Sequence, residues 1–278
     1  MIDKTSPFSR AATLRQLHNG PTILVLPNVW DVAGACLIQD LGFPAVATSS
    51  WAIASSLGYR DGQRISRQQM LDVVARIVSA VEIPVSADME AGYAQSPAQM
   101  AETTRALIAA GAVGLNLEDS EADRTRLVSL ELQLAKIEAL RATASSAGVP
   151  LVLNARTDAL WWNGASPETS WDDAVRRANA YRQAGADCVF VLGLRNAEEI
   201  QRFMRESPGP LNVLASAGIP PIPELQRYGV ARLSLGPGPY RAALGLLKKI
   251  AAELCGGGTY TSILENTIPA DEANRWFG

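Results

Sequence analysis

The sequence predicts an α/β protein, a (β/α)8 TIM barrel followed by a C-terminal tail. Short apolar segments alternate with segments of helical period along the whole chain. About eight such pairs in 278 residues is the content of one barrel. A doubly wound open sheet is the alternative. That fold would need a glycine-rich phosphate turn after an early strand, and no G-x-G-x-x-G follows one.

Eight segments rich in leucine and β-branched residues predict the strands. They are largely apolar, as strands buried on both faces of a parallel sheet require. In chain order the predicted strands are Thr22–Leu26, Ala45–Thr48, Pro84–Ala87, Val113–Leu117, Leu151–Ala155, Cys188–Leu192, Leu211–Leu214 and Arg232–Leu235.

Segments of helical period lie between these strands. Several end at a glycine, the residue that most readily adopts the left-handed conformation after a helix. These glycines are Gly42, Gly111, Gly148, Gly185 and Gly229. The predicted helices include Ala33–Leu41, Arg67–Val81, Pro97–Ala110, Leu130–Ala147, Trp171–Ala184 and Ala197–Arg205.

We expect a single barrel domain at residues 1–255 and a tail at residues 256–278. The three glycines Gly256–Gly258 form the one flexible joint of the chain. The tail ends in Trp276 and Phe277, two large apolar side chains. They favour docking of the tail on the barrel or on a partner subunit, and a disordered end is the alternative.

Composition excludes several classes of partner. A net charge of −3 gives no electrostatic basis for binding nucleic acid or an anionic membrane. The N-terminal residues lack the apolar run of a signal peptide, and no later segment could span a bilayer. The three cysteines lie far apart, without metal-type spacing. We therefore expect a cytoplasmic protein with no nucleic-acid or membrane partner.

Carboxylates follow the third and fourth predicted strands. Asp88 and Glu90 come after one strand, and Glu118 comes after the next. In a barrel the carboxyl ends of neighbouring strands meet at the same edge. Negative charge concentrated at a buried edge is costly unless a cation neutralises it. An all-oxygen donor set favours Mg²⁺, with Mn²⁺ as a possible substitute.

Other polar residues follow the first, second and fifth strands. Arg156 can bind a carboxylate or phosphoryl group through two parallel hydrogen bonds, although a structural ion pair with Asp158 is the alternative. A serine hydroxyl and backbone N–H groups after the second strand can hold an oxyanion, or the serines are merely small residues of a tight turn. The predicted substrate-binding residues are Trp30, Ser49, Ser50, Trp51, Asp88, Asn154 and Arg156.

Three further residues favour structural interpretations. His18, the only histidine, lies in a polar segment before the first strand and is expected at the surface. This excludes histidine-based triads and histidine-rich zinc sites. Asp31 and Asp119 each fit a helix cap.

Four stretches resemble the isocitrate lyase/phosphoenolpyruvate mutase superfamily over essentially the whole barrel. They are Ala45–Asp61, Ser86–Tyr93, Gly114–Asp119 and Asn154–Ala159. Members of this superfamily bind Mg²⁺ and a 2-oxo acid or enolate at the barrel mouth. The resemblance implies that Asp88 binds the metal directly.

The resemblance also implies roles for the residues around Asp88. Glu90 and Glu118 would act through metal-bound water, and Asp61 would orient this water. Arg156 would bind the substrate carboxylate. The Ser49–Trp51 stretch would hold the oxygens of the substrate. The catalytic set implied is therefore Asp61, Glu90, Glu118 and Arg156, and the metal set is Asp88, Glu90 and Glu118.

The segment Ser120–Val128 departs from the best-known members. Isocitrate and methylisocitrate lyases carry a Lys-Lys/Arg-Cys-Gly-His lid at this position, and phosphonomutases carry a lysine and an asparagine. Here the segment is short and has none of these residues. Candidates for a general acid or base nearby are Arg124, Arg126, Tyr59 and Tyr93.

The expected function is that of a Mg²⁺-dependent lyase. It would act on a small 2-oxo or 2-hydroxy carboxylate through a metal-stabilised enolate, by carbon–carbon cleavage or decarboxylation. One alternative is a mutase or hydrolase of the phosphonopyruvate/phosphoenolpyruvate type. Another is a non-catalytic protein that binds 2-oxo carboxylates. The resemblance implies a homo-oligomer, a dimer or a tetramer.

Overall fold

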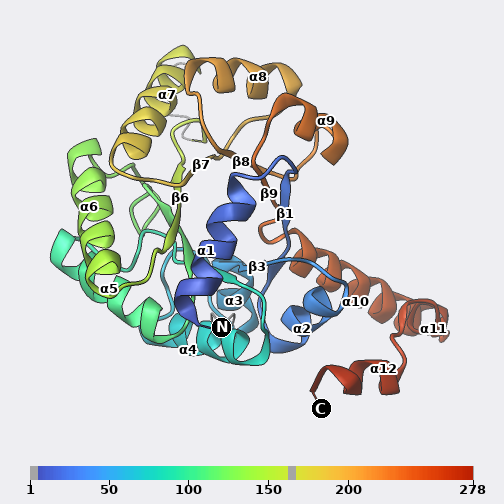
Figure 1. Ribbon diagram of the computed structural model, residues 1–278. Coiled ribbons are helices and arrows are strands. Elements are labelled where there is room, and N and C mark those ends of the chain that lie inside the picture. Colours follow the sequence, from blue (N-terminus) through green and yellow to red (C-terminus); the bar gives the residue numbers. More distant parts are fainter. Residues whose placement is uncertain (1–5, 162–166, 278) are drawn as a thin grey trace.

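A parallel sheet lies at the centre of the computed structural model, which describes residues 6–161 and 167–277. The sheet curls into a nearly closed barrel with helices around it (Figure 1). Its order is β1-β9-β8-β7-β6-β5-β4-β3-β2, and all pairings are parallel. The strands are β1 (Leu24–Leu26), β2 (Asn28–Val29), β3 (Val46–Thr48), β4 (Val85–Asp88), β5 (Gly114–Glu118), β6 (Val152–Thr157), β7 (Cys188–Val191), β8 (Leu211–Leu214) and β9 (Arg232–Ser234).

The first strand position of the barrel is divided at Pro27. β1 pairs with β9, whereas β2 pairs with β3. Proline has no backbone N–H to donate to a neighbouring strand. Its carbonyl oxygen still accepts a hydrogen bond of 2.9 Å from the Ala47 backbone N–H. β1 and β2 thus share one position, and the predicted eight-position barrel is confirmed.

Helices follow the strands as the sequence predicts. Six predicted helices are present with ends within four residues of those expected. The five predicted stop glycines all have positive φ, as a left-handed cap requires. The structure describes α1 (Pro7–His18), α2 (Val32–Asp40), α3 (Ser50–Ser56), α4 (Arg67–Ala80), α5 (Pro97–Ala109), α6 (Leu130–Ser146), α7 (Pro167–Gln183), α8 (Ala197–Glu206), α9 (Ile222–Tyr228), α10 (Gly238–Gly256), α11 (Thr261–Asn266), α12 (Ala270–Asn274) and the 3₁₀ helix η1 (Arg275–Phe277).

Helix α1 packs across the end of the barrel where the strands begin (Figure 1). Its Leu14 is buried and packs on Gly114, the first residue of β5. The expectation that His18 lies at the surface is wrong, because its side chain is only 2% exposed. His18 Nδ1 contacts the Leu14 carbonyl oxygen at 2.8 Å, and Nε2 lies 3.5 Å from Arg232 Nη1. The helical period of α1 turns this residue inward.

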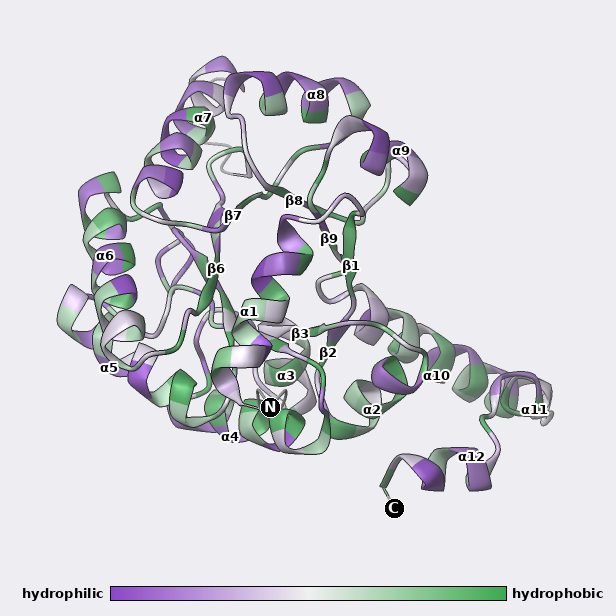
Figure 2. Cartoon of the chain, viewed as in Figure 1, coloured by the Kyte–Doolittle hydropathy of each residue, from purple (hydrophilic) through white to green (hydrophobic). Residues whose placement is uncertain are grey.

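The chain after the barrel forms an arm of helices α10, α11 and α12 (Figure 1). Helix α10 begins at the end of the barrel wall and buries none of its residues within this chain. The following η1 returns to α2, where Trp276 packs against a hydrophobic cluster that includes Ala35 and Cys36. Figure 2 shows hydrophobic residues along the arm, and Leu247 and Leu264 are among the exposed ones. In the part of the chain that the structure describes, no helix is long and apolar enough to cross a membrane.

Candidate active site

A polar cavity of about 260 Å³ lies where the strands end. Active sites of barrel enzymes are built at this face, from the loops that follow the strands. Trp30, which was predicted to bind substrate, does not line this cavity and instead contacts the Tyr240 ring, with centroids 5.0 Å apart. Predicted site residues that line the cavity are Ser49, Ser50, Trp51, Asp61, Asp88, Asn154 and Arg156.

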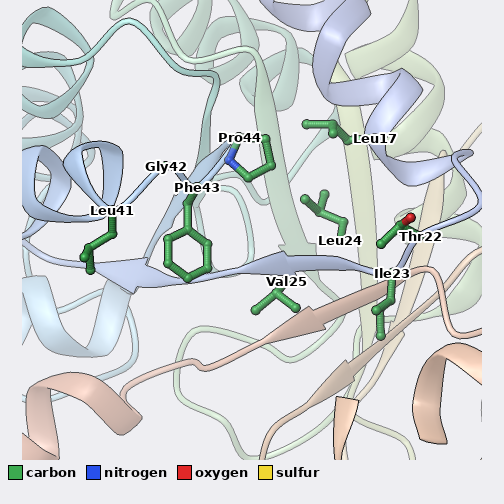
Figure 3. A pocket seen from close by; sticks show the side chains of 9 residues that line it. All are labelled: Leu17, Thr22, Ile23, Leu24, Val25, Leu41, Gly42, Phe43 and Pro44. Atoms are coloured by element: carbon green, nitrogen blue, oxygen red, sulfur yellow. The ribbon is translucent and has the colours of Figure 1, made fainter. Parts of the chain in front are cut away.

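Another cavity, of about 340 Å³, lies where β1 begins. Figure 3 shows side chains from β1, the end of α1 and the α2–β3 connection around it. All of its lining residues are uncharged, so it offers no acid, base or metal ligand: Leu17, Thr22, Ile23, Leu24, Val25, Leu41, Gly42, Phe43 and Pro44. The polar cavity, which lies where the strands end and is lined by most of the predicted site residues, is the candidate active site.

Asp88, at the end of β4, is held in one orientation by three hydrogen bonds. Its Oδ2 accepts from the Ser50 backbone N–H at 2.9 Å and from the Ser50 hydroxyl at 2.6 Å. Its Oδ1 accepts from Asn116 Nδ2 at 3.0 Å. Ser50 is the first residue of α3, and the Ser49 side chain caps that helix by accepting from the Ala52 N–H. The structure thus uses Ser49 as a cap and Ser50 to orient the carboxylate.

A chain of amides extends from Asp88 across the barrel interior. Asn154 Nδ2 donates to Asn116 Oδ1 at 3.0 Å, and Asn116 donates to Asp88. Register explains this arrangement, because Asp88, Asn116 and Asn154 are paired on β4, β5 and β6. Sequence analysis missed Asn116. Its signal was the spacing of two from Glu118, which places both side chains on the same face of a strand.

Glu90 is buried beside the cavity in an unusual backbone conformation. Its φ of 49° lies in the left-handed region, which non-glycine residues seldom adopt. Its Oε2 accepts from the backbone N–H groups of Gly62 and Gln63 at 3.1 and 2.8 Å. The Tyr93 hydroxyl donates to Oε1 at 3.3 Å. Burial, and then the charges of Asp88 and Asp61, raise the pKa of Glu90 to about 7.

Arg124 lies among three of the predicted carboxylates. Its Nη1 is 2.8 Å from Asp61 Oδ2, and its Nη2 is 3.4 Å from Glu118 Oε1 and 3.8 Å from Glu90 Oε2. The segment that carries it is folded back by a bridge between Ser120 and Leu127. The structure therefore makes Arg124 a counter-ion of the acidic cluster.

Arg156, on β6, lines the cavity and also forms the ion pair with Asp158 that the sequence left as an alternative. Its Nε and Nη2 bind the two oxygens of Asp158 at 2.5 and 2.9 Å. Its Nη1 is 2.9 Å from Glu118 Oε2, without the alignment of a hydrogen bond. Burial lowers the pKa of Arg156, but Asp158 and Glu118 more than offset this and raise it. Burial raises the pKa of Glu118 despite the two guanidinium groups beside it.

The two aspartates predicted as caps have different roles. Asp31 caps α2 by accepting from the Gly34 N–H at 2.7 Å, as expected. The prediction for Asp119 is wrong, because its carboxylate is fully buried. It accepts from the Asp158 N–H at 2.9 Å and from the Tyr181 hydroxyl at 2.6 Å. Asp119 thereby fixes the backbone of Asp158, the ion-pair partner of Arg156. Burial raises the pKa of Asp119.

The other acid–base candidates lie in different surroundings. Tyr59 is 45% exposed, and Arg126 pairs with Glu121 at the surface. Tyr93 is partly buried, and burial followed by the Glu90 charge raises the pKa of its hydroxyl. The Tyr93 hydroxyl therefore stays protonated and donates to Glu90.

The donors at the cavity fit a hard divalent cation. Within residues 6–161 and 167–277, no three acidic, histidine or cysteine side chains form a preformed metal cluster. Mg²⁺ does not need one, because it binds through one or two carboxylates and keeps several waters. Asp88 and Asp61 face the cavity, and Asp61 Oδ1 is buried without a hydrogen-bond partner among the described residues.

Comparison with known proteins finds relatives that match most of the chain. The family described as phosphoenolpyruvate phosphomutase matches residues 14–255. The chain is 32% identical over 220 residues to an oxaloacetate decarboxylase of Rhodopseudomonas palustris, covering 76% of this chain and 72% of the relative. It is 29% identical over 215 residues to a 2-methylisocitrate lyase of Bacillus subtilis, covering 75% and 68%.

The fold of the whole chain is also found among solved structures. A candidate lyase/mutase from Burkholderia cenocepacia superposes with a TM-score of 0.89 and 36% identity, over 98% of this chain and 96% of that one. The barrel fold and these similarities agree with one another. The chain belongs to the phosphoenolpyruvate phosphomutase family of the isocitrate lyase/PEP mutase superfamily.

Proposed function

We propose that this protein is a Mg²⁺-dependent carbon–carbon lyase that cleaves or decarboxylates a small 2-oxo or 2-hydroxy carboxylate through an enolate. The observation that carries the proposal is the pair of carboxylates Asp61 and Asp88 facing a cavity that Arg156 also lines. Relatives named oxaloacetate decarboxylase and 2-methylisocitrate lyase support carbon–carbon chemistry. The segment Ser120–Val128 lacks the lysine and asparagine of phosphonomutases, which disfavours phosphoryl transfer.

Asp88 would hold the metal directly, with Glu90 and Glu118 acting through water. When bound, Mg²⁺ would supply positive charge to the keto and carboxylate oxygens of the substrate. Ser50 and Asn116 keep the Asp88 carboxylate oriented toward this position. A preorganised ligand loses little free energy on binding, since its orientation is already fixed.

Arg156 would bind the carboxylate of the substrate. Asp158 fixes its guanidinium from one side, and Phe190 lies 5.6 Å from it on another. The group is thus held rigidly at the cavity wall, where its charge can favour an enolate without further rearrangement. Trp51 lines the same cavity, and its large ring would help to exclude water around a bound substrate.

The test is product formation from a panel of 2-oxo and 2-hydroxy acids with and without Mg²⁺. We expect release of pyruvate, glyoxylate or another 2-oxo acid from at least one of them, and loss of turnover in chelator. Release of phosphate from a phosphonate would instead indicate a hydrolase. Binding of 2-oxo acids with no product from any compound would contradict the proposed lyase.

Two variants assign the residues. Asp88→Asn should reduce Mg²⁺-dependent turnover at least about 100-fold, because it removes the anionic ligand. Arg156→Ala should chiefly raise KM, by about 2–5 kcal/mol of lost binding. Asp72→Asn, at an exposed position of α4, is the matched control and should leave both unchanged. Activity that survives Asp88→Asn and resists chelator would show that the metal assignment is wrong.

A further inference from the structure

One arginine at the polar cavity, Arg232, has no carboxylate partner in the described part of the chain, whereas Arg124 and Arg156 do. Arg232, on β9, lines the cavity and is 2% exposed. Arg124 and Arg156 each contact two or more carboxylates. Among the residues that the structure describes, no carboxylate lies within 4.0 Å of Arg232. A buried cation without a counter-ion is costly, so its presence at a cavity requires an explanation.

The near neighbours of Arg232 are neutral acceptors. Its Nε donates to the Ser234 hydroxyl at 3.1 Å, and its Nη1 lies 3.5 Å from His18 Nε2. His18 Nδ1 faces the Leu14 carbonyl oxygen, so this nitrogen carries the proton and Nε2 is left as an acceptor. Burial, and then the Arg232 charge, lower the pKa of His18 to about 4. Neither neighbour therefore offsets the charge of the guanidinium.

A second donor without a hydrogen-bond partner within the described residues lies on the neighbouring strand β8. Asn212 is fully buried, lines the same cavity and pairs in register with Arg232. Its Oδ1 accepts from the Ser234 hydroxyl at 3.1 Å, which sets the orientation of the amide. Its Nδ2 has no hydrogen-bond partner among the described residues. An unpaired buried donor costs free energy that a bound acceptor would recover.

We propose that Arg232 and Asn212 form an anion subsite at the floor of the cavity. The ligand that fits is a carboxylate, because it would neutralise the guanidinium and accept from the free amide. The floor belongs to the same cavity as Asp88 and Arg156, so the second carboxylate of a short 2-oxo diacid is the source that the geometry favours. That assignment rests on the proposed function. A free small carboxylate is the other source of the same chemistry.

Calorimetric titration in the presence of Mg²⁺ tests the subsite. We expect wild-type protein to bind 2-oxoglutarate or oxaloacetate roughly tenfold more tightly than pyruvate, since a charge-assisted hydrogen bond supplies this much. Arg232→Gln should abolish this preference while leaving pyruvate affinity unchanged. Arg241→Gln, at an exposed arginine that lines the same cavity, is the matched control and should keep the preference.

Formate provides a second test of the subsite that requires neither metal nor turnover. At millimolar concentration formate should raise the Tm of wild-type protein and of Arg241→Gln, but not that of Arg232→Gln. Stabilisation by formate without any preference for diacids would assign the subsite to a free anion. Absence of both effects would overturn the subsite. Loss of pyruvate binding alone would count against the proposed function and not against the subsite.

A second variant covers the case in which Arg232→Gln does not fold. Asn212→Leu replaces the amide by an apolar group of similar shape and keeps Arg232. It should reduce the preference for diacids and the formate effect without changing pyruvate affinity. A diacid preference that persists in Asn212→Leu and in any folded Arg232 variant would show that the floor does not bind the anion.

Discussion

His18 shows how a single side chain can be governed by its neighbours rather than by its position in the sequence. It is buried below the cavity floor, with its two ring nitrogens facing the Leu14 carbonyl oxygen and Arg232. Protonation would place a second positive charge beside the guanidinium, in surroundings that do not solvate it. The structure thus requires the neutral imidazole.

A pH dependence of stability follows from this requirement. The pKa of His18 falls from 6.5 to about 4 on folding, so the unfolded chain binds more protons between these values. The stability from neutral His18 is fully present above pH 6.5 and is lost as the pH falls toward 4, by about 3 kcal/mol in total. Urea unfolding of wild type and His18→Gln at several pH values measures this. The wild type should lose more stability than the variant, and parallel profiles would contradict the burial of a neutral histidine.

At the same scale, the sequence predicts some site residues better than others. Asp88 and Glu118 were predicted at the ends of apolar strands, and they end β4 and β5, since the end of a parallel strand has a fixed place in a barrel. The surroundings of Arg124 and Arg232 could not be predicted in this way. The first depends on the path of a loop and the second on a helix that closes the opposite end of the barrel, and neither leaves a local pattern.

Among the structural elements, the segment Ser120–Val128 has the most direct connection to the proposed metal site. It brings Arg124 to Asp61, Glu90 and Glu118, where a cation is expected. Arg124 itself has a φ of 54°, in the left-handed region. A guanidinium at these carboxylates would repel a divalent ion bound there and would compete with it for the same oxygens.

Removing this charge should strengthen metal binding. Arg124→Gln should lower the Kd for Mg²⁺ or Mn²⁺ roughly tenfold, because the carboxylates lose their internal cation. Isothermal titration of the metal in the absence of substrate measures this directly. Arg126→Gln is the matched control, because Arg126 lies on the same segment but pairs with Glu121 at the surface. Equal metal binding by Arg124→Gln would show that Arg124 does not compete with the metal, and weaker binding would show that it supports the site.

Elements with a regular apolar pattern were predicted closely. Short elements, and elements whose burial depends on distant packing, were not predicted. Leu211–Leu214 matches β8 at both ends, since a buried parallel strand is apolar throughout. Helix α3 was not predicted, because it is short and begins in the serines that were interpreted as a turn or an oxyanion site. Helix α1 was not predicted either, and its burial depends on packing across the barrel end.

At the scale of the molecule, the arm of α10, α11 and α12 has more apolar surface than one chain can cover. Helix α10 buries none of its residues, although Leu244 and Leu247 are among them. Leu264 of α11 is 70% exposed. Exposed apolar residues that lie together along one arm indicate a surface between proteins. The expected homo-oligomer would cover this surface with a second copy of the chain.

The oligomeric state can be tested through the arm itself. Sedimentation or light scattering should give wild-type protein a mass of two or four chains of 29.6 kDa. The double variant Leu247→Glu, Leu264→Glu should shift the mass toward that of one chain, because each glutamate would place a charge in an apolar contact. Lys248→Glu and Glu265→Lys together change charge at neighbouring exposed positions and should leave the mass unchanged. A wild-type mass of one chain would show that the arm does not join subunits. A mass of two or four chains that the leucine variants do not alter would place the contact elsewhere on the barrel.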